Sequence, residues 1–68
     1  MTYEKGDLLQ YKDRLLLVTE RSILDNADNY NETSCLVLKR GSNADYLEGE
    51  ILLFNTTWLN MHYHRLPQ

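Results

Sequence analysis

The sequence predicts an all-β fold in which five short strands form one small barrel, with a short 3-10 turn before the last strand. Two observations lead to this prediction. The apolar residues occur in short runs separated by charged or turn-forming residues, which is the pattern of successive strands. The 68 residues are enough for one domain, which we expect to span residues 1–68.

The first two predicted strands form a hairpin. A Gly-Asp turn at residues 6–7 leads into the apolar run of residues 8–11, and two charges at residues 12–13 separate it from the run of residues 14–20. Two such runs around a short polar break are typical of a β-hairpin. A helix through both runs is the competing interpretation, because leucine favours helices. We prefer strands because the runs are short and contain valine, threonine and tyrosine.

The middle of the chain alternates between turn-rich and apolar segments. Residues 25–34 are dominated by Asn, Asp, Ser and Thr, which favour turns, so they predict the longest loop. Residues 35–39 predict the third strand. A tight turn at residues 40–43 follows, in which Gly41 or Asn43 supplies a positive φ.

The last part of the chain predicts two strands joined by one helical turn. Residues 50–54 form the fourth strand, and residues 55–59 form the 3-10 turn, whose opening Asn-Thr-Thr can cap a helix start. Residues 60–66 alternate in polarity and predict the final strand. Its inward face is expected to hold Leu59, Met61 and Tyr63.

A family resemblance rests mainly on the opening of the chain. Residues 3–14 follow the pattern Y-x-x-G-D-L-L-x-Y-K-x-R, and an apolar strand comes next. Together with the order of the expected elements, this resembles the SH3-like small β-barrels, including the KOW and Tudor-like groups. KOW-type chains carry a glycine inside the second strand, whereas residues 15–17 here are all leucine. The chain also resembles small bacteriophage proteins, which implies the cytoplasm of an infected bacterial host.

Composition narrows the class of protein. The net charge is -3, which lacks the basic excess that dominates DNA affinity. The single cysteine cannot form a disulfide within the chain and fits a reducing compartment. No apolar run is long enough for a membrane span, so we expect a cytoplasmic protein. No catalytic motif is present, so we expect no enzyme activity and no cofactor.

Surplus apolar side chains predict a protein-binding role. In the second strand Leu15 and Leu17 oppose Leu16 and Val18, so both faces are apolar. One small interior cannot hold them all, and the remainder predicts an exposed patch that binds a protein partner or a second copy, as in a homodimer. The predicted contact residues are Leu16, Val18, Tyr30, Tyr46, Leu52 and Trp58.

The alternative function is binding of RNA or single-stranded DNA. Its candidate cationic residues are Lys12, Arg14, Lys39 and Arg40. Tyr11, Tyr46 and Trp58 would offer stacking surfaces, as in small barrels that bind single strands. The acidic balance favours the interpretation that these charges are scattered and solvated.

Two further features are candidates for metal binding or catalysis. His62 and His64 would project to the same side of a strand and could chelate a metal, but no ligand-spacing motif accompanies them, so we expect no metal site. Cys35 could act as a nucleophile, although a free cysteine in an apolar strand is more often a buried hydrophobic residue.

Overall fold

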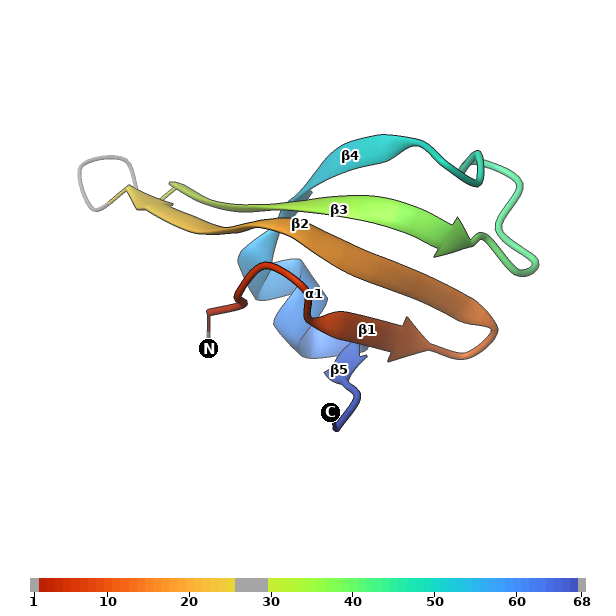
Figure 1. Ribbon diagram of the computed structural model, residues 1–68, viewed down its shortest axis with the longest axis horizontal. Coiled ribbons are helices and arrows are strands. Elements are labelled where there is room, and N and C mark those ends of the chain that lie inside the picture. The colour runs from red at the N-terminus through yellow and green to blue at the C-terminus, as the bar shows by residue number, and fades with distance from the viewer. Residues whose placement is uncertain (1, 26–29, 68) are drawn as a thin grey trace.

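One antiparallel sheet of five strands and one short helix make up the fold (Figure 1). The computed structural model describes residues 2–25 and 30–67. The elements in chain order are β1 (Leu8–Tyr11), β2 (Arg14–Asp25), β3 (Tyr30–Lys39), β4 (Ile51–Asn55), α1 (Thr56–His62) and β5 (His64–Arg65). The prediction of an all-β fold with five strands is therefore confirmed.

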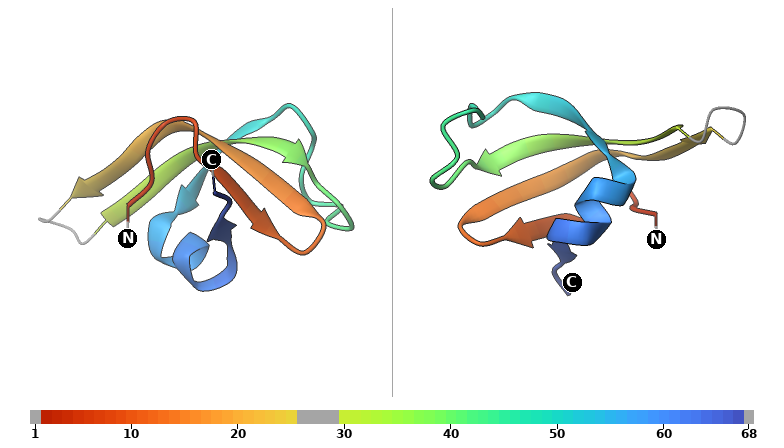
Figure 2. Two further views of the ribbon diagram at one scale, coloured as in Figure 1. Left: turned by 60° about the horizontal axis from the view of Figure 1, so that its bottom comes forward. Right: turned by 180° about the vertical axis from the view of Figure 1, so that it is seen from behind.

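The sheet is not closed into a barrel. Its strand order is β4-β3-β2-β1-β5, so β4 and β5 form the two edges. These edges are joined in the chain by α1, which lies on one side of the bent sheet (Figure 2). The helix takes up the space between the edges, and the predicted closure by a further strand ladder does not occur.

The first hairpin matches its prediction. Leu9 pairs with Leu16 and Tyr11 with Arg14, which leaves a two-residue connection. Lys12 has a φ of 56°, the left-handed conformation that such short hairpin loops use. The competing helix is therefore wrong.

The long loop predicted for residues 25–34 is wrong in most of its extent. β2 continues through Asp25 and β3 begins at Tyr30, and the two strands pair up to Asp25 opposite Tyr30. Residues 26–29 lie outside the described part of the chain. Strand pairing supplies backbone hydrogen bonds that override the local preference of Asn, Asp and Thr for turns.

The turn after β3 confirms the predicted role of Gly41. Its φ is 57°, and the Asn43 amide donates to the Arg40 carbonyl oxygen at 3.0 Å. A Cβ at Gly41 would collide with Asp13, whose carboxylate accepts the Ser42 amide at 2.9 Å. Glycine is therefore required both for the backbone conformation and for the close approach to the β1–β2 turn.

The segment before β5 is an α-helix rather than the predicted 3-10 turn. Asn55 is its N-cap, and the Asn55 Oδ1 atom accepts the Trp58 amide at 3.0 Å. The helix runs to His62, so β5 keeps only two residues. Met61 is consequently 73% exposed, which corrects its predicted inward position, while Leu59 and Tyr63 are buried as predicted.

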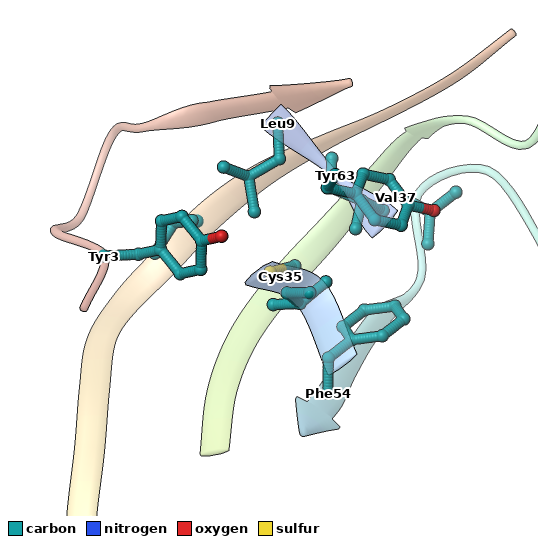
Figure 3. Packing of buried hydrophobic residues seen from close by; sticks show 9 residues of the cluster. Tyr3, Leu9, Cys35, Val37, Phe54 and Tyr63 are labelled. Carbon is teal, nitrogen blue, oxygen red and sulfur yellow. The ribbon is translucent and has the colours of Figure 1, made fainter. Parts of the chain in front are cut away.

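The core lies between the inner face of the sheet and α1 (Figure 3). Its buried hydrophobic residues are Tyr3, Leu9, Leu16, Val18, Cys35, Val37, Phe54, Leu59 and Tyr63. The hydroxyl groups of Thr33 and Thr56 are also buried and lie 2.8 Å apart, which joins β3 to the start of α1.

Candidate protein-binding surface

The inner face of the sheet is filled by the core. Leu16 and Val18, which the sequence analysis assigned to a contact surface, are 0% and 1% exposed. Their position on β2 points them toward the core, because alternate residues of a strand face opposite sides. Neither side chain is available at the surface, and this part of the predicted site is corrected.

The outer face of the sheet carries a continuous apolar row. Leu8 pairs directly with Leu17, Leu17 with Leu36, and Leu36 with Ile51. On the other side of Leu8, its carbonyl oxygen accepts the Leu66 amide at 2.8 Å, which continues the register of β5 with β1. We call this set the outer row; it consists of Leu66, Leu8, Leu17, Leu36 and Ile51.

Exposure of the outer row is greatest at its β4 end. Leu8, Leu17, Leu36 and Leu66 are partly exposed, whereas Ile51 is 61% exposed. Leu53, two residues further along β4 and therefore on the same face, is also 61% exposed. The apolar surface is thus most accessible where the row meets the edge of the sheet.

The backbone hydrogen bonds show how β4 is oriented. The Val37 amide donates to the Glu50 carbonyl oxygen at 2.9 Å, and the Val37 carbonyl oxygen accepts the Gly49 amide at 2.8 Å. Successive residues of a strand turn their backbone groups to opposite sides. The N–H and C=O groups of Cys35, two residues before Val37, therefore also point toward β4. Leu52, its register partner, faces back toward β3.

By the same alternation, the N–H and C=O groups of Ile51 and Leu53 point to the open edge of β4. None of the described strands pairs with that edge. The edge therefore combines exposed backbone hydrogen-bonding groups with two exposed apolar side chains.

The other predicted contact residues do not belong to this surface. Tyr46, Leu52 and Trp58 are partly buried and pack against the core. The side chain of Tyr30, at the start of β3, lies outside the described part of the structure. The predicted contact residues whose side chains are described therefore lie in or against the core, and none of them belongs to the outer row.

A second feature is a cluster of aromatic rings near the β1–β2 turn. The Trp58 ring lies 5.0 Å from the His62 ring and 5.8 Å from the Tyr63 ring, between ring centres. Tyr11 lies 5.8 Å from His62, and Phe54 stacks on Trp58 at 6.2 Å. We call these rings, together with Tyr46 against Phe54, the aromatic cluster.

Cationic residues border the aromatic cluster. The Lys12 Nζ atom lies 5.2 Å from the centre of the Tyr11 ring, and the Arg14 guanidinium carbon lies 5.3 Å from it. Lys39 and Arg40 are exposed at the same end of the sheet, since Lys39 pairs with Leu15.

Acidic residues interleave with these cations. Asp13 lies in the β1–β2 turn and accepts the Ser42 amide, and Glu48 accepts the Arg40 amide at 3.3 Å. The end of the sheet that carries the predicted nucleic-acid residues is therefore of mixed charge.

The two histidines are not placed as a strand would place them. His62 is in the last turn of α1, beside Trp58, and His64 is exposed on β5. The prediction that they share one side of a strand is wrong, because α1 extends further than expected. In residues 2–25 and 30–67, no three His, Cys, Asp or Glu side chains are grouped so that they could hold a metal ion.

Cys35 is fully buried in the core. Burial raises the pKa of its thiol from 9.0 to about 12. The thiol is therefore protonated at neutral pH, whereas a nucleophilic cysteine needs an accessible thiolate. This environment agrees with the interpretation of Cys35 as a small hydrophobic residue.

These features define a small antiparallel sheet protein with one apolar row across the outer face of its sheet. Comparison with family models, with curated proteins and with solved structures finds no match for the chain. Among the described residues, no helix is both long and apolar enough to cross a membrane.

Proposed function

We propose that the protein is a non-enzymatic interaction module that binds a protein partner through the outer row. The observation that supports this most directly is the direct pairing of apolar residues across β1, β2, β3 and β4, on the face opposite the core, with Leu66 bonded to Leu8 just after β5. A contiguous exposed apolar surface on a small protein is unfavourable in water and is typical of an interface.

The chemistry of the row suits a protein better than a charged ligand. The row contains only leucine and isoleucine, and it offers no cation for a phosphate and no carboxylate for a metal. Its central members, Leu17 and Leu36, have polar neighbours in Thr19 and Ser34, whose hydroxyl groups lie 2.9 Å apart. An apolar centre with polar surroundings is the usual composition of a protein interface.

Replacing the centre of the row tests the proposal. The double variant Leu17→Thr, Leu36→Thr removes apolar surface and keeps residues that favour strands. The wild-type chain is immobilised and exposed to an extract of its own cells. A protein that it retains is purified, and its binding to the chain is titrated by calorimetry. We expect at least a ten-fold weaker Kd for the double variant. Met61→Thr, which changes an exposed residue of α1, serves as the matched control and is expected to bind as the wild type does. An unchanged Kd for the double variant would contradict the proposal.

The proposal includes the resemblance to SH3-like small barrels. It is supported by the order in which consecutive strands are neighbours, by the pairing of the last strand with the first, and by the short helix between β4 and β5. The difference from a closed barrel is that the two edge strands, β4 and β5, do not pair with each other. A fold of this kind hosts many functions, so the proposed role depends on the surface and not on the fold.

A second candidate function is binding of single-stranded nucleic acid at the aromatic cluster. It is favoured by the two cations placed over the Tyr11 ring, since bases stack on aromatic rings and phosphates bind cations. Fluorescence anisotropy with a short labelled single strand tests it. We expect binding that weakens steeply with salt and that is reduced by Arg14→Gln. No binding at low salt would exclude this function.

A further inference from the structure

The open edge of β4 indicates a specific partner. We infer that this partner is a second copy of the chain, joined to the first by antiparallel pairing of β4 with β4. The inference rests on the proposed function, because Ile51 is both the last residue of the outer row and part of the open edge.

The edge has the features of a strand that accepts another strand. Ile51 and Leu53 direct their backbone N–H and C=O groups outward, and both side chains are 61% exposed. Residues Ile51–Asn55 contain no charged residue and no proline, which are the usual means of preventing edge-to-edge pairing. Addition of a strand to such an edge satisfies the free backbone groups.

The sequence of β4 is suited to pairing with itself. In a two-fold arrangement centred on Leu52, Ile51 lies opposite the partner's Leu53, and Leu53 lies opposite the partner's Ile51. Each of these pairs would exchange both of its backbone hydrogen bonds. The exposed side chains of Ile51 and Leu53 from both copies would then form one apolar cluster on the outer face. The outer row of one copy would continue into that of the other.

Charge supports a second copy in spite of the net charge of -3. Glu50 is the charged residue next to β4, and the two-fold alignment places it opposite the partner's Phe54, away from the partner's Glu50. Like charges do not meet along the paired edge. Because β4 itself is uncharged, it offers no charged group that would select a basic or an acidic strand of another protein.

The short pairing predicts a weak dimer. β4 is five residues long, and Gly49 before it and α1 after it limit how far pairing can extend. Interfaces of this size lie at the small end of the range for specific complexes. We therefore expect a dissociation constant in the micromolar range or weaker.

Sedimentation equilibrium of the full chain, from micromolar to millimolar concentration, tests the inference. Leu53→Pro removes an N–H that points to the open edge and leaves the bonds of Leu52 and Phe54 to β3 in place. Leu53→Lys places two like charges diagonally across the paired edge. We expect a concentration-dependent dimer for the wild type and at least ten-fold weaker association for both variants. Met61→Lys, with the same charge change on exposed α1, is expected to dimerise as the wild type does.

Amide exchange gives a direct readout of the same pairing. The amides of Leu52 and Phe54 face β3 and should be protected at every concentration, whereas those of Ile51 and Leu53 should become protected only as the dimer forms. A wild-type chain that stays monomeric to millimolar concentration overturns the inference, as does a dimer that survives both Leu53 variants.

The two proposals can fail separately. If the dimer is lost in the double variant Leu17→Thr, Leu36→Thr and kept in both Leu53 variants, copies associate through the outer face; the proposed function then stands and the edge pairing does not. If the edge variants alone abolish the dimer, and the double variant binds every partner normally, the edge pairing stands and the role of the outer row does not.

Discussion

The two edges of the sheet differ in ways that bear on function. β5 has two residues, and Pro67, which has no N–H to donate, lies two positions after its end. Its Arg65 forms an ion pair with Asp7 at 3.5 Å. β4 has five residues without charge, and two of its side chains are largely exposed.

This difference indicates that only one edge is protected against pairing. A short strand, a charged side chain and a proline are the features by which soluble proteins prevent association at sheet edges. They occur together at β5 and are absent from β4. The inner side of β4 is nevertheless firmly attached, since Phe54 and Leu52 pack on the core. β4 is therefore anchored to the core and has an open outer side, which is what a pairing surface requires.

The largest effect is expected when the packing of β4 against the core is removed. Phe54 is buried and contacts the Tyr46 and Trp58 rings. Phe54→Ala is expected to lower the free energy of unfolding by about 3–5 kcal/mol, because it leaves a cavity. The adjacent Leu53→Ala, on the exposed side, should lower it by less than about 1 kcal/mol. Urea unfolding at a concentration where the chain is monomeric measures both. Equal losses would mean that β4 is not attached through its inner face.

Alkaline pH tests the burial of Cys35 on β3, the strand that pairs with β4. Cys35 pairs with Leu52, and burial raises its pKa in the folded chain from 9.0 to about 12. The folded state thus holds the thiol proton more tightly than the unfolded state. Stability from this group is fully present below pH 9 and is lost as the pH rises toward 12. The rise in the pKa of Cys35 corresponds to as much as ~4 kcal/mol of folding stability.

Chemical unfolding at a series of pH values between 8 and 12 measures this loss. Burial also raises the pKa of Tyr3, Tyr46 and Tyr63, so these groups add to the loss above pH 10. Cys35→Ala is the control, and its stability should decline less between pH 9 and 10. An identical decline in that variant would show that the thiol is not the responsible group.

The first hairpin illustrates what the sequence could predict. The short polar break at residues 12–13 fixed a two-residue turn, and that turn also fixes the pairing of Leu8 with Leu17. This was the available signal for the start of the outer row. The sequence does not show which face of the second strand is buried, because all four residues of Leu15–Val18 are apolar and both faces look alike. The position of α1 decides which face is covered.

The errors beyond the first hairpin have two physical origins. Tertiary pairing extended β2 and β3 through residues whose local preference is for turns. The helix that begins after the cap at Asn55 runs to His62 instead of ending after one turn, and this shortens β5. The exposure of Met61 and the separation of the two histidines both follow from this longer helix. The open edge of β4 could not be anticipated, since the prediction closed the barrel.

A smaller effect is expected at the junction between β4 and α1. The Asn55 side chain accepts the Trp58 amide, which satisfies one of the free donors at the helix start. Asn55→Ala should lower the free energy of unfolding by about 1 kcal/mol, and Asn55→Asp should largely restore it. Thermal unfolding of the three proteins measures the difference. Full stability of Asn55→Ala would mean that the cap does not hold the end of β4.

The smallest effect is expected at the protected edge. Arg65 and Asp7 form an ion pair in which the arginine side chain is 45% exposed, so the attraction is screened by water and salt. Arg65→Gln should change the stability by no more than about 1 kcal/mol, and the difference should vanish in 1 M salt.

The consequence of Arg65→Gln for association is more informative. Removing the charge leaves β5 short and still followed by Pro67. If shortness and proline suffice to protect this edge, sedimentation of Arg65→Gln should match the wild type. If its association strengthens, the charge itself is the protecting element, and the comparison with the uncharged β4 becomes correspondingly stronger.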